Sequence, residues 1–174
     1  PALRAAAVAE LQALQDPETG LFKEESHHPF HTTAHCIAAL ELFDAGPLYP
    51  PIGLFEYRDP QRLKAFLAGL DWAGRPWNQS HRGTGVFAAL ALTGNAPPAW
   101  RQVYFNWLDD HCDPEYGMSL RGAIQSGTTD PARHLFGWFH YLFNYLYARR
   151  AFPHAPRLID SCLQLYREHR MPEP

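Results

Sequence analysis

The stretch "LRAAAVAELQALQDPETGLF", residues 3–22, decides the fold of this chain. Its first part repeats apolar side chains at spacings of three and four, as one face of an α-helix does: Leu3, Ala7, Leu11 and Leu14. Pro17 cannot continue a helix, and Gly20 permits a tight turn. We therefore expect a helix over Leu3–Gln15 that ends at the turn "DPETG".

The same pattern returns later in the chain. "HCDPEYGMSL", residues 111–120, again joins a helix end to Asp-Pro-Glu-x-Gly and an apolar residue. A more apolar helix follows each turn, and histidine stands at its entrance: His31 with His35 after the first turn, His134 after the second. Between them, the loop "DWAGRPWNQSH" brings His81 to the start of a third such helix. These features indicate an internal repeat of helical hairpins, which would bury the apolar helices and gather their N-termini at one end.

Helical periodicity and start signals account for the rest of the chain. After the first helix we expect helices over Thr32–Asp44, Pro60–Asp71, His81–Gly94, Pro97–Cys112, Pro131–Arg150 and Ala155–His169. No segment shows the strict alternation typical of a strand. The sequence therefore predicts an all-α protein of α-α hairpin repeats, with about seven helices in a single helical-repeat domain over residues 1–174.

Composition limits the class of protein. Of the 174 residues, 46% are hydrophobic and 19% are charged, which is typical of a globular domain with a buried core. The net charge of −3, without a run of Lys or Arg, argues against a partner made of nucleic acid or an anionic membrane. No apolar run is long enough for a membrane span, no signal peptide is visible, and Cys36, Cys112 and Cys162 show no disulfide framework. We expect a cytoplasmic protein. It begins with Pro rather than Met, as an excised piece of a longer chain would.

The first hairpin resembles the α/α-toroid families, namely the squalene and oxosqualene-type cyclases and the β subunits of protein prenyltransferases. In "LQALQDPETGLF", Gln15, Gly20 and Phe22 match the repeat motif of those families, and "HTTAHCIAALELF" is similar to the inner helix that follows it. The resemblance implies a partial α/α toroid. The chain would then be a half-ring, a fragment of a larger toroid or chain, or a unit that associates with itself. It implies architecture only, because the DxDD motif of the cyclases and the zinc residues of the prenyltransferases are absent.

A histidine-rich segment precedes the second expected helix. "HHPFHTTAH" contains His27, His28, His31 and His35. If a helix starts here, His31 and His35 share a face, and His28 at its cap approaches the same side. Two imidazoles one helical turn apart suit Zn²⁺ or another divalent metal, for which His81 or Glu25 could supply a third ligand. Acid–base catalysis and a structural hydrogen-bonding role are the alternatives. Because the glutamate of an HExxH motif is absent and the spacing arises readily by chance, we expect no cofactor and no metal.

A second group of polar side chains surrounds Trp77 in "RPWNQSHRGTG", residues 75–85. Aromatic rings beside amide and cationic groups suit sugar rings, carboxylates or isoprenoid cations. The alternative is that the tryptophans only pack the loop onto the repeat. The candidate substrate-binding residues are His35, Trp72, Arg75, Trp77, Asn78 and Arg82.

Three functions are compatible with these sequence features. The first is an enzyme, or a domain of one, that acts on a small organic substrate, glycan or isoprenoid-like, in a cavity at the inner-helix N-termini. Its catalytic acid–base groups would be His31, His81 and His134, which we expect to lie near one another. The second is a non-catalytic helical-repeat module that binds a partner protein or assembles. The third is a metal-dependent enzyme that uses His28, His31 and His35.

Overall fold

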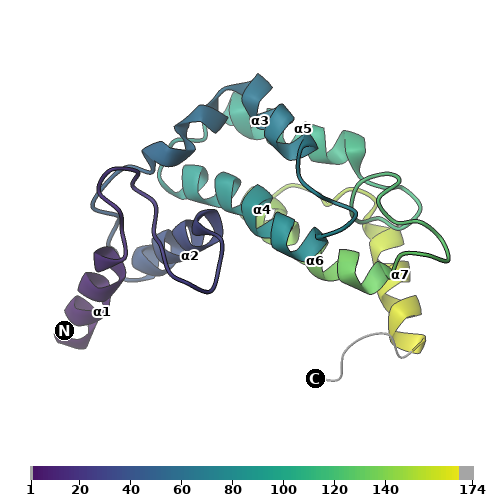
Figure 1. The fold of residues 1–174 in the computed structure, drawn as a ribbon, viewed down its shortest axis with the longest axis horizontal. Coiled ribbons are helices and arrows are strands. Elements are labelled where there is room, and N and C mark those ends of the chain that lie inside the picture. The colour runs from purple at the N-terminus through teal and green to yellow at the C-terminus, as the bar shows by residue number, and fades with distance from the viewer. Residues whose placement is uncertain (1, 169–174) are drawn as a thin grey trace. The chain divides into compact units, whose positions relative to one another are not determined.

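The computed structural model describes residues 2–168, and within them the protein is all-α (Figure 1). Its elements are α1 (Ala2–Ala13), α2 (Pro29–Leu42), the 3-10 helix η1 (Ile52–Arg58), α3 (Pro60–Ala68), α4 (Pro76–Leu92), α5 (Pro98–His111), α6 (Pro131–Tyr147) and α7 (Ala155–Arg167). No strand occurs in this part of the chain, which confirms the predicted fold class. None of the described helices is long and apolar enough to cross a membrane.

Two helix starts differ from the prediction. Helix α2 begins at Pro29 rather than Thr32, and α4 begins at Pro76 rather than His81. In both cases a proline occupies the first helical position, where its missing N–H costs nothing and its fixed φ favours the helix. Consequently, His81 lies inside α4 and not at its entrance. The last expected helix extends to His169, which lies outside the described residues.

The described residues form two compact units. Unit 1 holds residues 2–68 and 81–103, and unit 2 holds residues 69–80 and 104–168. Neither unit is one continuous segment, because α4 and α5 each contribute residues to both. The single domain over residues 1–174 stays a prediction.

The two Asp-Pro-Glu-x-Gly turns have the same backbone geometry. The Gly20 N–H donates to the Asp16 carbonyl at 2.7 Å, and the Gly117 N–H donates to the Asp113 carbonyl at 2.8 Å. Both glycines have left-handed backbones, with φ of 69° and 68°. Each turn also closes with one isolated antiparallel bridge: Gln15 with Phe22, and Cys112 with Leu120. The repeated sequence motif therefore produces a repeated local structure.

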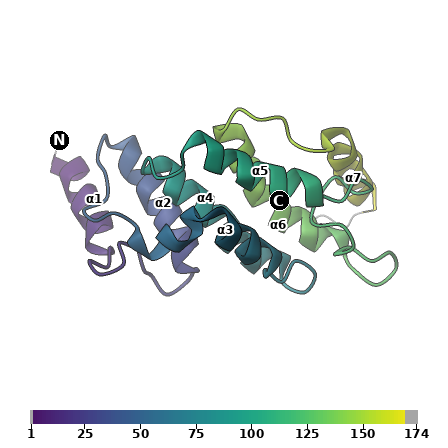
Figure 2. The ribbon, with the colours of Figure 1, turned by 90° about the horizontal axis from the view of Figure 1, so that it is seen from above.

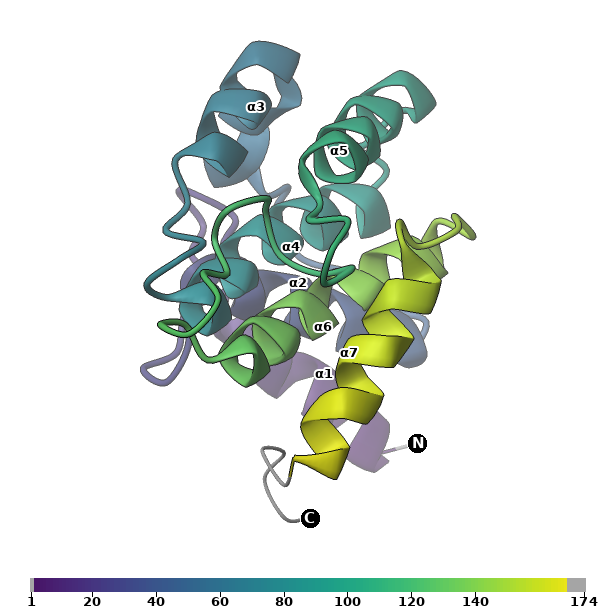
Figure 3. The same ribbon diagram turned by 90° about the vertical axis from the view of Figure 1, so that its right-hand side faces the viewer.

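Each turn packs tightly against the segment that follows its inner helix. A Cβ at Gly20 would lie 1.9 Å from the Pro50 carbonyl oxygen, and one at Gly117 would lie 2.4 Å from the Leu158 nitrogen in α7. In unit 1, α1 and α2 pack side by side (Figure 2). In unit 2, α7 packs against α6 (Figure 3). Only glycine fits these turns, because a side chain would meet backbone atoms.

Glycines also allow the apolar helices to approach one another. In unit 1, a Cβ at Gly85 of α4 would lie 2.5 Å from the carbonyl carbon and oxygen of Phe30 and 2.9 Å from the His31 nitrogen. In unit 2, a Cβ at Gly137 of α6 would lie 2.7 Å from the carbonyl group of Pro76. Each contact holds the first turn of one helix against the middle of the next. The first of them positions the histidines.

Buried side chains form the core of each unit. The large, fully buried side chains of unit 1 are Phe22, Leu40, Leu54, Leu63, Leu67, Phe87 and Leu90, and those of unit 2 are Tyr104, Phe105, Trp138, Tyr141 and Tyr145. The aromatic residues of α6 that face this core therefore have a packing role, whereas Phe139 and Phe143 of the same helix are exposed.

Candidate functional site

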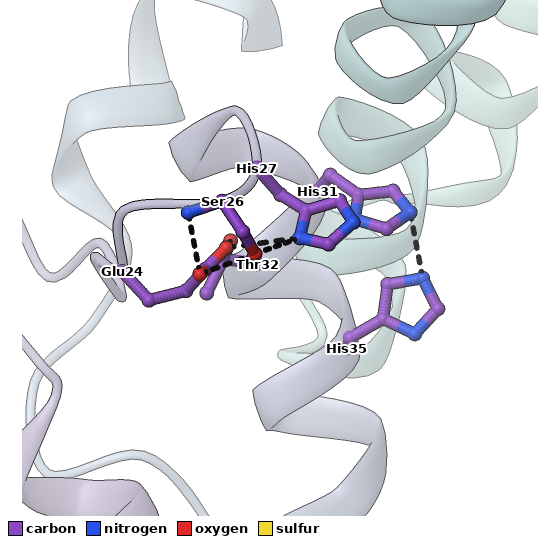
Figure 4. Close-up of polar contacts among 6 residues, drawn as sticks. All are labelled: Glu24, Ser26, His27, His31, Thr32 and His35. Atoms are coloured by element: carbon purple, nitrogen blue, oxygen red, sulfur yellow. Dashed lines mark hydrogen bonds and ion pairs between the residues drawn. The ribbon is translucent and has the colours of Figure 1, made fainter.

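Helix α2 presents two histidines on one face. The chain enters the helix at His28, whose Nδ1 accepts a hydrogen bond from the Phe30 N–H at 3.2 Å. His31 and His35 follow one helical turn apart, so their side chains meet. Their Nε2 atoms lie 3.0 Å apart (Figure 4).

His81 of α4 joins this pair. The close approach of Gly85 to Phe30 holds α4 against the start of α2. As a result, the ring centroids of His31 and His81 are 4.2 Å apart, and one ring nitrogen of each lies within 4.8 Å of the other. The His81 side chain is buried, whereas His31 is partly exposed. The predicted proximity of these two histidines is present in the structure.

His27 completes a group of four imidazoles in unit 1. Its ring stacks on His31 with a centroid distance of 5.2 Å and lies 5.8 Å from the ring of His81. We call His27, His31, His35 and His81 the histidine cluster. The rings reach it from the loop before α2, from α2 itself and from α4.

Glu24 and Ser26 orient the His27 ring (Figure 4). The Nδ1–H of His27 donates to Glu24 Oε1 at 3.1 Å and lies 2.5 Å from Ser26 Oγ. Ser26 donates to the other carboxylate oxygen through both its Oγ, at 2.6 Å, and its backbone N–H, at 2.7 Å. Together with a contact from Thr32, these hydrogen bonds lower the pKa of Glu24 to about 2. The anionic carboxylate thus holds Nδ1, which leaves Nε2 as the nitrogen that could bind a ligand.

Ser26 is not arranged as a catalytic nucleophile. In a Ser-His-acid triad the serine and the carboxylate contact opposite ring nitrogens, so that one nitrogen accepts the serine proton while the carboxylate orients the other. Here both Ser26 and Glu24 contact Nδ1 of His27. The arrangement therefore orients the ring but cannot activate the serine through it.

The local environment favours the neutral form of two neighbouring imidazoles, those of His28 and His35. Partial burial lowers the pKa of His35, and the nearby His27 lowers it further. Burial also lowers the pKa of His28, with a smaller contribution from the Arg82 guanidinium. A neutral imidazole keeps one nitrogen lone pair available, as a metal ligand or a general base requires.

The distance between His31 and His35 is close to that of two histidines that bind the same metal ion. Two imidazole nitrogens bound to one tetrahedral zinc ion, at about 2.0–2.1 Å each, lie about 3.3 Å apart. The observed separation of the two Nε2 atoms is 3.0 Å. A small adjustment of either side chain would let both nitrogens bind one ion. Without an ion, the same distance suits a hydrogen bond between two neutral rings of opposite tautomers.

The structure changes the ligand set that the sequence predicts. The sequence groups His28 with His31 and His35, but the Nδ1 of His28 caps α2 and its ring packs edge-on against Phe30. His27 stacks on His31 instead, because the loop before α2 folds back over His31. Helical spacing could not reveal this, since His27 lies outside the helix. The sequence also did not reveal Glu24 as the partner of His27, because Glu24 lies outside the helix as well.

His134 lies in unit 2, on the first turns of α6. Its side chain is 1% exposed, and its Nδ1 lies 2.9 Å from Ser119 Oγ. Burial lowers the pKa of His134, Arg133 lowers it further, and Asp130 acts in the opposite direction. A buried, hydrogen-bonded ring fits a structural role. The predicted proximity of His134 to His31 and His81 concerns residues of both units and stays a prediction.

The predicted substrate-binding residues separate into four environments. Arg75, Trp77 and Asn78 line one pocket in unit 2. Trp72 does not join them, because its indole is 7% exposed and packs against the rings of Trp107, Trp138 and Tyr141. In unit 1, Arg82 lies over the Phe66 ring at 5.5 Å, and His35 belongs to the histidine cluster.

No protein-family model, curated protein or solved structure matches this chain.

Proposed function

We propose that this chain is a metal-dependent enzyme, or a domain of one, whose histidine cluster holds a transition-metal ion. The observation that carries the proposal is the meeting of three imidazoles from two helices: the Nε2 atoms of His31 and His35 are 3.0 Å apart, and a ring nitrogen of His81 lies within 4.8 Å of one of His31. The proposal replaces the expectation of no cofactor, which rested on sequence spacing alone.

The donor set indicates which ion would bind. Imidazole nitrogens suit zinc, copper, nickel and iron, whereas magnesium and calcium prefer oxygen ligands. His27, with Nδ1 held by Glu24, has the carboxylate partner that commonly orients a histidine ligand. Zinc is therefore the first ion to test.

The chemistry that such an ion supplies is the activation of water or of a polarised carbonyl or phosphoryl group. Within the cluster, His81 is buried while His27 and His35 reach the surface, so a substrate could approach from the solvent side. An imidazole that does not bind the ion could accept the proton of the attacking water. Hydrolysis of a small organic substrate is the reaction class that these residues support best.

The metal content of the purified protein tests this proposal. Protein made without a histidine tag and purified without chelator should carry about one transition-metal ion per chain. The double variant His31→Ala/His35→Ala should lose the ion. His154→Asn is the matched control, because His154 lies before α7 and asparagine tolerates its left-handed backbone, with φ of 50°. Protein that takes up no zinc, cobalt or nickel, or a double variant that retains the ion, would contradict the proposal.

Single alanine variants of the remaining histidines would complete the ligand set. Hydrolysis of chromogenic esters and phosphate esters should then be compared for the metal-free and the reconstituted protein. Activity should appear with the ion and disappear in the variants that do not bind it.

Acid–base catalysis without a metal is the second candidate function. The pair of Glu24 and His27 favours it, because a carboxylate that holds one ring nitrogen raises the basicity of the other. The reaction class is the one that the sequence predicts first, but that prediction assigned the acid–base role to His31, His81 and His134 rather than to His27. Activity that is unaffected by complete metal removal, yet lost in His27→Ala, would distinguish it.

We also propose that the hairpins belong to an α/α toroid and that the protein works in the cytoplasm. The repeated turns at Gly20 and Gly117 support the first statement. The second is supported by the three cysteines, which are all free thiols.

A further inference from the structure

Unit 2 contains a small pocket between the start of α4 and the start of α6. Its volume is about 160 Å³, and its lining consists of Arg75, Pro76, Trp77, Asn78, Arg133 and Phe136. The contact of Gly137 with the Pro76 carbonyl fixes α6 against this end of α4. The two walls of the pocket are therefore held by a backbone contact and not by flexible side chains alone.

Two guanidinium groups provide the charge of this pocket. Arg75 and Arg133 are exposed, and neither takes part in an ion pair within residues 2–168. Arg133 makes a long hydrogen bond of 3.4 Å to the Gly74 carbonyl. The first turn of α4 adds the partial positive charge of a helix N-terminus.

Two carboxylates lie close to this pocket in the sequence and have backbone partners. Asp71 Oδ1 accepts from the Gly74 N–H at 2.8 Å, and Asp130 Oδ1 accepts from the Ala132 N–H at 3.2 Å. Each closes a turn or caps a helix. The guanidinium groups thus remain able to bind a planar or tetrahedral oxyanion through paired N–H donors.

An apolar surface completes the pocket. Trp77 is 46% exposed, and on one side its indole packs against His140 with a centroid distance of 4.5 Å. Phe136 is half-buried and lies in the same lining. The volume of about 160 Å³ is close to that of a cavity of about 150 Å³ that accommodates benzene. This volume is sufficient for one aromatic ring.

We infer that this pocket binds a small oxyanion, carboxylate or phosphate, carried on a single aromatic or similarly sized apolar group. Arg75 and Arg133 would contact the oxyanion, while Trp77 and Phe136 would contact the ring. Asn78 adds an amide that can donate to the anion or accept from a neighbouring hydroxyl. The inference is independent of the metal proposal, because every residue named lies in unit 2 and none belongs to the histidine cluster.

Ligand-observed fluorine NMR tests this inference on the full chain. Metal is first removed on a chelating resin, so that anions cannot bind to an ion. The probes are 4-fluorobenzoate, 4-fluorophenyl phosphate and the neutral 4-fluorobenzamide, with inorganic phosphate as a competitor. At least one aromatic anion should bind, and at least about tenfold more tightly than the neutral amide. The stronger of the two anions identifies the oxyanion as carboxylate or phosphate.

Variants then locate the binding site. Arg75→Gln and Arg133→Gln should each weaken anion binding by about tenfold, and Trp77→Ala should weaken binding of the aromatic anions but not that of inorganic phosphate. Arg157→Gln is the control, because it removes an exposed arginine of α7 in the same unit. Circular dichroism confirms that each variant is folded. Equal binding of the anions and the amide, no binding of either anion, or unchanged binding in both arginine variants would overturn the inference.

Discussion

Replacing Gly85 by alanine should separate the two helices that form the histidine cluster. Gly85 lies in α4, where a new methyl group would point at the first turn of α2. That methyl carbon would lie 2.5 Å from the carbonyl carbon and oxygen of Phe30 and 2.9 Å from the His31 nitrogen. The atoms that it meets belong to the backbone, so no side chain can rotate out of the way. The helices have to move apart instead.

The cost follows from two opposing effects. Ordinary contacts of a methyl carbon are about 3.5 Å, so α4 must retreat by about 1 Å. Overpacking of this kind costs about 1–3 kcal/mol, and the backbone contact places Gly85→Ala near the upper end. Alanine stabilises a helix interior by about 1 kcal/mol relative to glycine. The net loss is about 2 kcal/mol in the free energy of unfolding, which lowers the Tm of a chain of this length by about 4–8 °C.

Thermal unfolding of the metal-free protein measures this loss. Gly46→Ala is the control in the same unit, because a Cβ at Gly46 has nothing within 4 Å, and it should leave the Tm unchanged or raise it slightly. Zinc titration of Gly85→Ala should also show an affinity at least about tenfold lower, since metal sites tolerate shifts of only about 0.2 Å in ligand distances. A Gly85→Ala protein with the stability and zinc affinity of the wild type would refute the close approach of α4 to α2.

Three further predictions concern single residues. Glu24→Gln should lower zinc affinity by about tenfold or more in a direct titration, because His27 loses its carboxylate partner. The control variant Glu25→Gln should leave the affinity unchanged. The opposite result would show that Glu25, and not Glu24, supports zinc binding. Gly117→Ala should destabilise the protein more than Gly94→Ala in denaturant unfolding. Both positions have left-handed backbones, but only a Cβ at Gly117 would also clash, at 2.4 Å from the Leu158 nitrogen. Equal losses of stability would show that the turn does not pack closely against α7. His134→Gln should reduce the acid sensitivity of folding. The pKa of His134 is lowered in the folded state, so the stability that it confers is present above the unfolded pKa of about 6.5 and is lost as pH falls toward the folded value, at up to about 1.4 kcal/mol per pH unit. Identical pH dependence of the variant and the wild type between pH 7 and pH 5 would contradict this assignment.

Local sequence signals were sufficient for most of the helices. Prolines at first helical positions and glycines after last ones act within one or two turns of chain, so their effect does not depend on the rest of the fold. The two Asp-Pro-Glu-x-Gly turns belong to this class, and their matching geometry follows from Gly20 and Gly117. The predicted start of α4 was wrong. The small residues after Gly83 suggested a helix that begins at His81, whereas the helix already begins at Pro76.

Part of the candidate site was also within reach of the sequence. The spacing of His31 and His35 predicts that they share a face, because both lie on one helix. The proximity of His31 and His81 was also predicted, but from a wrong premise: His81 does not begin its helix, and the close approach of Gly85 to Phe30 brings its ring to His31. The choice of His27 over His28 did not follow, because it depends on how residues 23–28 fold back over α2 and on the Glu24 carboxylate that holds the ring.

The sequence by itself therefore determined the helices, the repeated turns and the histidines that share a helix face, because each depends on contacts between near neighbours in the chain. Only the tertiary structure decided which imidazoles meet, which tryptophan is buried and which lines a pocket. Trp72 and Trp77 are only five residues apart in the sequence, but Trp72 packs among the rings of the unit 2 core and Trp77 stays half-exposed beside two arginines. That difference arises from packing between helices, where shape and burial act over distances that no local pattern records.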